Sequence, residues 1–152
     1  MIRLGIDVES EVIDKLFNEG SLSPREEAKA RLKLAERYLR EGGGLIDRDA
    51  VQASEKLYKS AEEAIKALAI AKELDEAREA KRRGRWTLAL LDSAAKKLSE
   101  EINERIYDDW THAYFIYVEG FHEARLGTEQ VKTRLKYIEE LISIARGHLN
   151  KQ

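Results

Sequence analysis

The chain contains no cysteine, a single proline and a single methionine among its 152 residues. The lack of cysteine excludes disulfides, thiolate metal sites and cysteine nucleophiles, and it fits the reducing cytoplasm, where we expect the protein to act. No apolar run approaches the roughly 20 residues that a membrane-spanning helix needs, and we expect neither a membrane anchor nor a signal peptide. Because the only proline is Pro24, long stretches are free to be helical.

The chain also lacks an excess of positive or negative charge. Charged residues make up 37% of the chain, but 27 basic and 29 acidic residues nearly cancel to a net charge of -2. This balance gives no overall attraction to nucleic acid or to an anionic membrane, so such binding requires a local patch. The hydrophobic fraction of 43% argues for one folded domain over residues 1–152. Abundant Glu, Lys and Arg beside few Asn, Gln, Cys and Met indicate a thermophilic source.

Hydrophobic residues recur at helical spacing, and no stretch alternates with the period of a strand. We therefore predict an all-α, up-and-down antiparallel bundle of about five to six helices, since the connections between them are short. The expected helices cover about residues 9–18, 23–41, 47–83, 86–104, 105–126 and 128–149. The short first helix, within residues 1–20, packs on or flanks the bundle through its apolar side, which carries Val12, Ile13, Leu16 and Phe17.

Several expected boundaries rest on capping signals. Ser23 and Glu26, with Pro24 at the first helical position, are typical of a capping box. The three glycines at residues 42–44 are expected to end that helix, and Asp47 is expected to cap the next one. The charged stretch at residues 72–81 is expected to continue the helix that Asp47 begins, up to a break at Gly84. The helices over 86–104 and 105–126 form either one rod or two.

A family resemblance comes from residues 35–67, where a helix ending in YL meets a glycine turn and a helix that reads ASEKLYKSAEEAIKA. Trp110, Ala113, Phe115 and the long aromatic helix around them add to it. Over about residues 28–145 the chain resembles the archaeal PaREP family. The members of that family look like distant members of the HEPN superfamily of helical bundles. The resemblance implies an up-and-down bundle that often dimerises. Within the superfamily some proteins are metal-independent ribonucleases and others are partners of nucleotidyltransferases.

The predicted helix over residues 105–126 has two contrasting sides. At about 100° of rotation per residue, one side faces the core. Its residues are Ile106, Trp110, Ala113, Tyr117, Phe121 and Ala124. The opposite stripe consists of Asp108, His112, Phe115, Glu119, His122 and Leu126. This stripe faces either solvent or a partner, and its apolar members favour a dimer interface, so Phe115, Glu119 and His122 are candidate binding residues.

Arg105 and His112 form an R-x6-H pair, at the limit of the R-x4-6-H spacing that the resemblance to HEPN ribonucleases implies for catalysis. An imidazole moves the proton of a ribose hydroxyl near neutral pH, and a guanidinium holds phosphate charge. The polar residue that usually follows the arginine in those enzymes is replaced here by Ile106. The alternative is structural, with Arg105 paired to Asp108 or Asp109 one turn further along the helix.

A second candidate binding group is the basic run Arg82, Arg83, Arg85 and Trp86. Cations and an indole at a helix boundary can hold a phosphate or a base. Alternatively, these cations simply meet the negative end of a helix dipole.

We expect no metal and no cofactor. Glu119 and His122 have the E-x-x-H spacing of di-iron bundles, but the chain carries one such motif where these sites need two. The glycines at 42–44 lack the strand and the Gly-Lys-Ser/Thr of a phosphate loop.

The sequence therefore predicts a non-enzymatic binding or interaction module that forms a homodimer. One alternative is a metal-independent endoribonuclease that uses Arg105 and His112, with RNA as its partner. Another is a helical partner of a nucleotidyltransferase.

Overall fold

The computed structural model describes residues 8–151, leaving aside the side chains of Val8, Phe17 and Asn18, so the expected inward place of Phe17 lies outside the described residues. The helices are α1 (Val8–Asn18), α2 (Pro24–Leu45), α3 (Ala50–Ala71), α4 (Asp75–Arg83), α5 (Leu88–Glu101), α6 (Arg105–Phe115), the π-helix η1 (Ile116–His122) and α7 (Thr128–Asn150). The predicted all-α class is confirmed, with seven α-helices in the described range instead of five or six.

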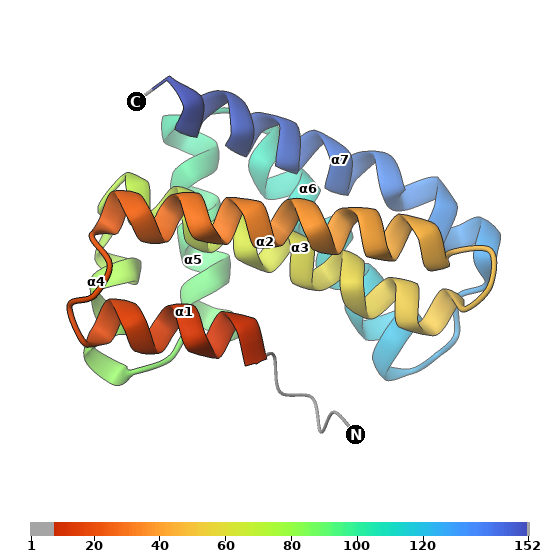
Figure 1. Cartoon of the computed structure of the whole chain (residues 1–152). Coiled ribbons are helices and arrows are strands. Elements are labelled where there is room, and N and C mark those ends of the chain that lie inside the picture. Colours follow the sequence, from red (N-terminus) through yellow and green to blue (C-terminus); the bar gives the residue numbers. More distant parts are fainter. Residues whose placement is uncertain (1–7, 152) are drawn as a thin grey trace.

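Helix α3 is the centre of the bundle. Nearly every side chain from Ala61 to Ile70 is buried, whichever way it points around the helix. Its many alanines let α2, α5, α6, η1 and α7 pack against it. Figure 1 shows α2 alongside α3, with α7 above them, α1 below and α5 running across their direction. A helix that is apolar on all sides must be surrounded by other helices, since packing supplies most of the stability of a helix within a protein.

Helix α1 packs on α2 with a polar side inward. Ser10 is buried, Asp14 is half-buried, and both accept hydrogen bonds from Arg31 of α2. Val12 and Leu16, which the pattern placed on the inward side, are instead 50% and 36% exposed. That prediction is wrong because the buried guanidinium of Arg31 requires polar partners, and this side of α1 supplies two of them.

Helix α2 runs through the three glycines to Leu45, so the predicted stop at residues 42–44 is wrong. A Cβ atom on Gly42 would lie 2.9 Å from Cγ and Cδ2 of Leu57, and glycine is therefore required where α2 approaches α3. Gly43 and Gly44 have open space around them, and nothing in the structure explains why these two are glycine.

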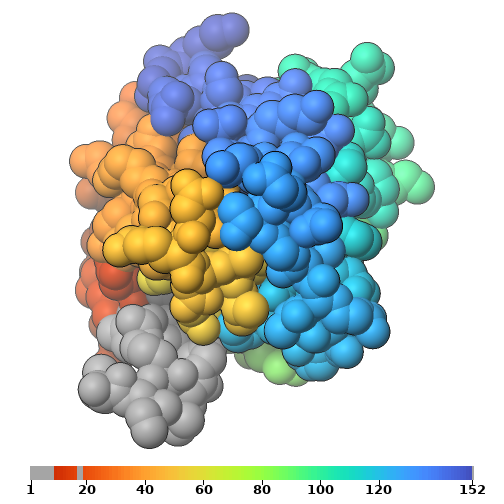
Figure 2. All heavy atoms as spheres, turned by 90° about the vertical axis from the view of Figure 1, so that its right-hand side faces the viewer, coloured from red at the N-terminus to blue at the C-terminus, as the bar shows by residue number. Residues whose placement is uncertain are grey.

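Helix α3 starts two residues later than predicted. Its cap is Asp49, whose carboxylate accepts a backbone hydrogen bond from the first turn at 3.1 Å. Asp47 instead forms an ion pair of 3.0 Å with Lys132 of α7. Figure 2 shows the α2–α3 turn packed against the start of α7. There the hydroxyl of Thr128 donates a hydrogen bond to the backbone of the turn at 3.2 Å. The second aspartate therefore caps the helix, while the first ties the turn to α7.

The charged stretch after α3 forms the separate helix α4, so the predicted continuous helix is wrong. Glu73 adopts a left-handed φ of 54°, and the N–H of Leu74 donates to the carbonyl of Ala69 at 3.0 Å. The Leu74 side chain then turns into the core. A left-handed residue followed by a buried apolar one is a common way to end a helix, but glutamate gives no sequence sign of it. Gly84 ends α4 as predicted, with φ 80°.

Other predicted boundaries are confirmed. The capping box is present, with Ser23 N–H donating to Glu26 Oε1 at 2.9 Å and Glu26 N–H donating to Ser23 Oγ at 3.1 Å. Helix α7 begins at Thr128. Helices α5 and α6 are two rods, and Ser99 Oγ donates to the carbonyl of Glu104 at 2.8 Å in the turn between them. Among residues 8–151, no helix has both the length and the apolar character needed to cross a membrane.

The predicted helix over 105–126 is α6 followed by the π-turn η1. A π-helix fits more residues into each turn, so the side that faces the core shifts. Ile116 and Gly120 occupy the core side of η1, while Phe121 is half-buried and Ala124 is exposed, contrary to the predicted core positions. A Cβ atom on Gly120 would lie 2.2 Å from Ser54 Oγ, so η1 meets α3 at this glycine.

Candidate functional site

The predicted catalytic residues lie along the seam between α6 and α7. Arg105 donates to Glu140 Oε1 at 3.0 Å through Nε and to Asp108 Oδ2 at 3.2 Å through Nη1, and its Nη2 lies 3.8 Å from Asp109 Oδ1. The structural alternative, in which Arg105 pairs with these aspartates, is therefore present, and Glu140 of α7 joins them. Two carboxylates, those of Glu140 and Asp108, accept hydrogen bonds from the guanidinium, while the Arg105 side chain stays 43% exposed.

Asp109 is fully buried in this seam. Burial, with the neighbouring carboxylate of Glu140, raises the pKa of Asp109 to about 8, so Asp109 carries a proton at neutral pH. Asp109 and Arg105 together hold the pKa of Glu140 below its usual value. Two carboxyl groups with pKa values pushed apart form an acid and a base side by side, an arrangement found in active sites and in structural ion networks alike.

His112 lies two turns beyond Arg105 on the same side of α6, about 10 Å along the helix axis. Its ring stacks on Tyr137 of α7, with centroids 3.6 Å apart and 4° between the planes. Burial, with the nearby cation of Arg134, lowers the pKa of His112. The ring is therefore neutral at pH 7, which suits a general base, but its face is covered by the tyrosine.

The other candidate residues of the predicted stripe contact either α7 or charged residues at the surface. The guanidinium of Arg134 lies over the ring of Phe115, 4.2 Å from its centroid, yet Phe115 remains 39% exposed. Glu119 accepts two hydrogen bonds from Arg125, at 2.7 and 3.1 Å. His122 pairs through Nδ1 with its neighbour Glu123 at 2.8 Å. Glu119 and His122 therefore pair with different partners, and no group of three or more metal-ligating side chains gathers in the described part of the chain.

An aromatic cluster lies on the α3 side of α6. Tyr58 stacks on Tyr117 at 4.2 Å, and its ring centroid is 5.7 Å from that of Trp110. Tyr114 meets Tyr58 edge-on at 6.4 Å, and Phe121 stacks on Tyr117 at 5.9 Å. Tyr114, at the outer edge of the cluster, is 36% exposed and stands next to the exposed Phe115 in the sequence. The sequence prediction named Phe115 but missed Tyr114.

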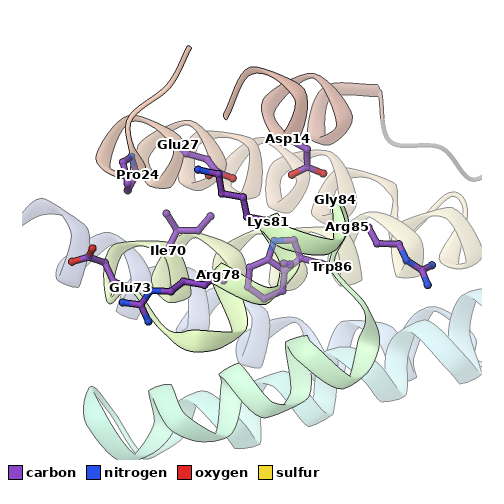
Figure 3. Close-up of a pocket in the computed structure, with 12 residues that line it drawn as sticks. Asp14, Pro24, Glu27, Ile70, Glu73, Arg78, Lys81, Gly84, Arg85 and Trp86 are labelled. Carbon is purple, nitrogen blue, oxygen red and sulfur yellow. The ribbon is translucent and has the colours of Figure 1, made fainter. Parts of the chain in front are cut away.

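The predicted basic run is divided by the turn at Gly84. Arg82 and Arg83 both pair with Glu79 on the exposed surface of α4. This arrangement agrees with the structural alternative, in which the cations lie at the negative end of a helix. Arg85 and Trp86, beyond the turn, line a cavity of about 200 Å³. Its other lining residues are Asp14, Pro24, Glu27, Ile70, Glu73, Ala77, Arg78, Ala80, Lys81 and Gly84. Figure 3 shows Lys81 reaching from α4 towards Glu27, with the indole of Trp86 beside it and Arg85 pointing away.

A buried ionic cluster beside this cavity was not predicted. Arg31 is fully buried and donates to Glu27 Oε2 at 2.7 Å and to Glu63 Oε1 at 2.8 Å. Lys66 donates to Glu63 Oε2 at 3.1 Å, and Asp14 of α1 pairs with Arg31 from the other side. Burial alone would raise the pKa of Glu63, but Lys66 and Arg31 hold it below its usual value. One signal was available, since Arg31 falls within the apolar stripe of its own helix.

Fold and site together define a small all-helical bundle with a charged seam between α6 and α7 and a cavity beside α4. The chain belongs to the archaeal PaREP1/PaREP8 family, whose model matches residues 30–142. The crystal structure of a Sulfolobus solfataricus protein is 37% identical, covers 74% of this chain and 93% of that one, and superposes with a TM-score of 0.69. A solution structure from the same structural genomics target is 40% identical over 73% of this chain and 87% of that one, with a TM-score of 0.64. No curated protein matches the chain.

Proposed function

We propose that this protein is a non-catalytic binding module that acts as a homodimer, joined through the outer face of α6 around Tyr114 and Phe115. The observation that carries the proposal is the exposure of these two adjacent aromatic side chains, 36% and 39%. Aromatic residues are enriched in interfaces, and two neighbouring exposed rings at the edge of an aromatic cluster supply apolar area for a partner to bury. The resemblance to HEPN bundles, which often dimerise, supports a homodimer.

The environment of the predicted catalytic pair supports a binding role. Arg105 is held by carboxylates from its own helix and from α7, and these compete with a substrate phosphate for its donors. His112 is stacked on Tyr137. Both side chains therefore contribute to the contact between α6 and α7.

Interface variants test the dimer. Phe115→Lys places a second cation beside Arg134 and removes apolar area from the proposed contact, so we expect it to shift the protein towards monomer in light scattering. Leu88→Lys is the matched control, because Leu88 is similarly exposed (44%) but lies on α5. A dimer that both variants leave intact would place the interface elsewhere, and a dimer lost with Leu88→Lys alone would place it on α5.

An endoribonuclease is the second candidate function. It is favoured by the position of Arg105 and His112 on one side of α6 and by the lowered pKa of His112, which keeps the ring neutral and able to accept a proton. The test is cleavage of single-stranded RNA with a chelator present. Activity that Arg105→Ala and His112→Ala abolish, while Arg82→Ala retains it, supports catalysis. No cleavage by the wild type, or equal cleavage by all variants, removes this candidate. The role of helical partner to a nucleotidyltransferase stays a prediction.

A further inference from the structure

The cavity beside α4 has the make-up of a small-molecule site. Its walls include the aliphatic side chains of Ile70, Ala77 and Ala80 and the indole of Trp86, and its volume is about 200 Å³. Cavities that bind small organic molecules are mostly apolar, with a few polar groups that fix the orientation of the ligand. The remaining lining residues determine which ligand chemistry fits.

Glu27 is the polar group at the buried end of the cavity. It is only 2% exposed. Its Oε2 accepts a hydrogen bond from Arg31, whereas its Oε1 is buried and has no hydrogen-bond partner within the described part of the chain. A buried carboxyl oxygen without a partner is costly, so a ligand that donates a hydrogen bond there gains the full benefit. Burial, with the nearby carboxylate of Glu63, raises the pKa of Glu27 to about 7, so the group holds or releases a proton near neutral pH.

The lining of the cavity also carries three cations, Arg78, Lys81 and Arg85, together with the acidic Glu73, and Arg85 points away from the cavity (Figure 3). Arg78 pairs with Asp75 outside the cavity at 2.8 Å. Lys81 extends over the cavity towards Glu27 (Figure 3), where its charge opposes the rise in the pKa of that group. An acidic group on a ligand would meet the cations of Arg78 and Lys81 while its body lies against the indole.

We propose that the cavity binds a small aromatic molecule that donates an N–H hydrogen bond to Glu27 Oε1, lies against the indole of Trp86 and places an acidic group near Arg78 and Lys81. Two common classes of molecule have this chemistry, namely aromatic amino acids and purine nucleotides. A nucleic-acid strand is too bulky for a cavity of this size. Asp14, Glu27 and Glu73 all line the cavity, but no three metal-ligating side chains come together within the described residues, and a metal ion would need more ligands. The proposal is independent of dimer formation and of RNA cleavage.

Matched probes on the intact protein test the proposal. Phenylalanine is compared with phenylpropionate, which lacks the N–H donor, and with phenethylamine, which lacks the acid. Guanosine monophosphate is compared with guanosine, which lacks the phosphate. Binding is measured by calorimetry and by the indole N–H signals of the two tryptophans, Trp86 in the cavity and Trp110 in the core. Trp86→Leu assigns the signals.

We expect one complete probe to bind with a Kd of about 1 mM or tighter, to move the Trp86 signal and not that of Trp110, and to bind at least about tenfold more tightly than its truncated forms. Glu27→Gln and Trp86→Leu should each weaken binding by about tenfold or more, while the exposed control Glu139→Gln should not. A response to phenylalanine or to the nucleotide identifies the class. The proposal is overturned if neither complete probe binds saturably, if binding leaves the Trp86 signal unmoved, or if the truncated probes bind equally well. Since the wild-type signals locate the ligand, the test stands even where a variant fails to fold.

Discussion

Asp109 on α6 faces Glu140 on α7 across the seam between their helices, and the pKa values of the two carboxyl groups are pushed in opposite directions. Asp109 is fully buried, and burial beside Glu140 raises its pKa to about 8, whereas the pKa of Glu140 is lowered. Two ionised carboxylates side by side would repel each other, and the buried Asp109 is shielded from the screening that water provides. The seam is therefore assembled around a protonated aspartic acid at neutral pH.

This relationship predicts a pH dependence of stability. The native state binds a proton that the unfolded state releases above the ordinary aspartate pKa of 3.8, so the contribution of Asp109 is complete below 3.8 and is lost as the pH rises to about 8. Glu140 acts in the opposite direction, at acid pH, because its pKa is lowered. We expect the free energy of unfolding in urea to fall by about 1–3 kcal/mol between pH values of about 5 and 8.

Asp109→Asn is the informative variant for that prediction. The amide does not titrate, so the decline in unfolding free energy over this pH range should become shallower, and the slope that remains comes from Glu27, whose pKa is also raised. The exposed Asp108→Asn is the control and should retain the decline. A wild type whose stability is constant or rises over the range would contradict the raised pKa of Asp109.

The buried ionic cluster predicts a strong dependence on Arg31. Replacing it in Arg31→Met leaves the buried carboxylates Glu27 and Glu63 without their shared cation, and we expect a loss of about 3–5 kcal/mol in the free energy of unfolding. Arg37→Met removes exposed ion pairs with Glu9 of α1 and with Glu41 of its own helix and should cost less than about 1 kcal/mol. Equal effects in guanidinium unfolding would show that the cluster is not buried in solution.

Replacing two different glycines by alanine should change the stability in opposite directions. Gly120→Ala introduces a Cβ atom 2.2 Å from Ser54 Oγ, where η1 approaches α3, and should destabilise the protein by about 1–3 kcal/mol. Gly43→Ala meets no atom within 4 Å in the last turn of α2 and should stabilise the protein by about 0.5–1 kcal/mol. Thermal unfolding measures both, and a neutral Gly120→Ala would contradict the close approach of the π-turn to α3.

Local patterns were sufficient to predict the helices whose ends carry side-chain or glycine signals. The capping box at Ser23 and the left-handed Gly84 are examples, because each depends on a few neighbouring residues. The glycines at 42–44 were misread, since the chain uses Gly42 to bring α2 against Leu57, a partner in another helix. The helix end at Glu73 was missed because no glycine marks it.

The candidate site was less accessible to sequence reasoning, since its residues meet only in the fold. The pairing of Arg105 with its own helix followed from spacing, but Glu140 and Tyr137 come from α7 and could not be placed. The inward side of α1 was assigned by hydrophobicity alone, although the buried Arg31 selects Ser10 and Asp14 instead. Tertiary partners overrode local pattern in each case.

The proposed homodimer is the central claim, and the mass of the wild type in solution tests it most directly. Sedimentation equilibrium over a range of concentrations should give twice the chain mass of 17.4 kDa, with dissociation promoted by Phe115→Lys. A mass that stays at 17.4 kDa at the highest concentration reached would contradict the claim, and the exposed Tyr114 and Phe115 would then be surface residues without a copy of this chain as their partner.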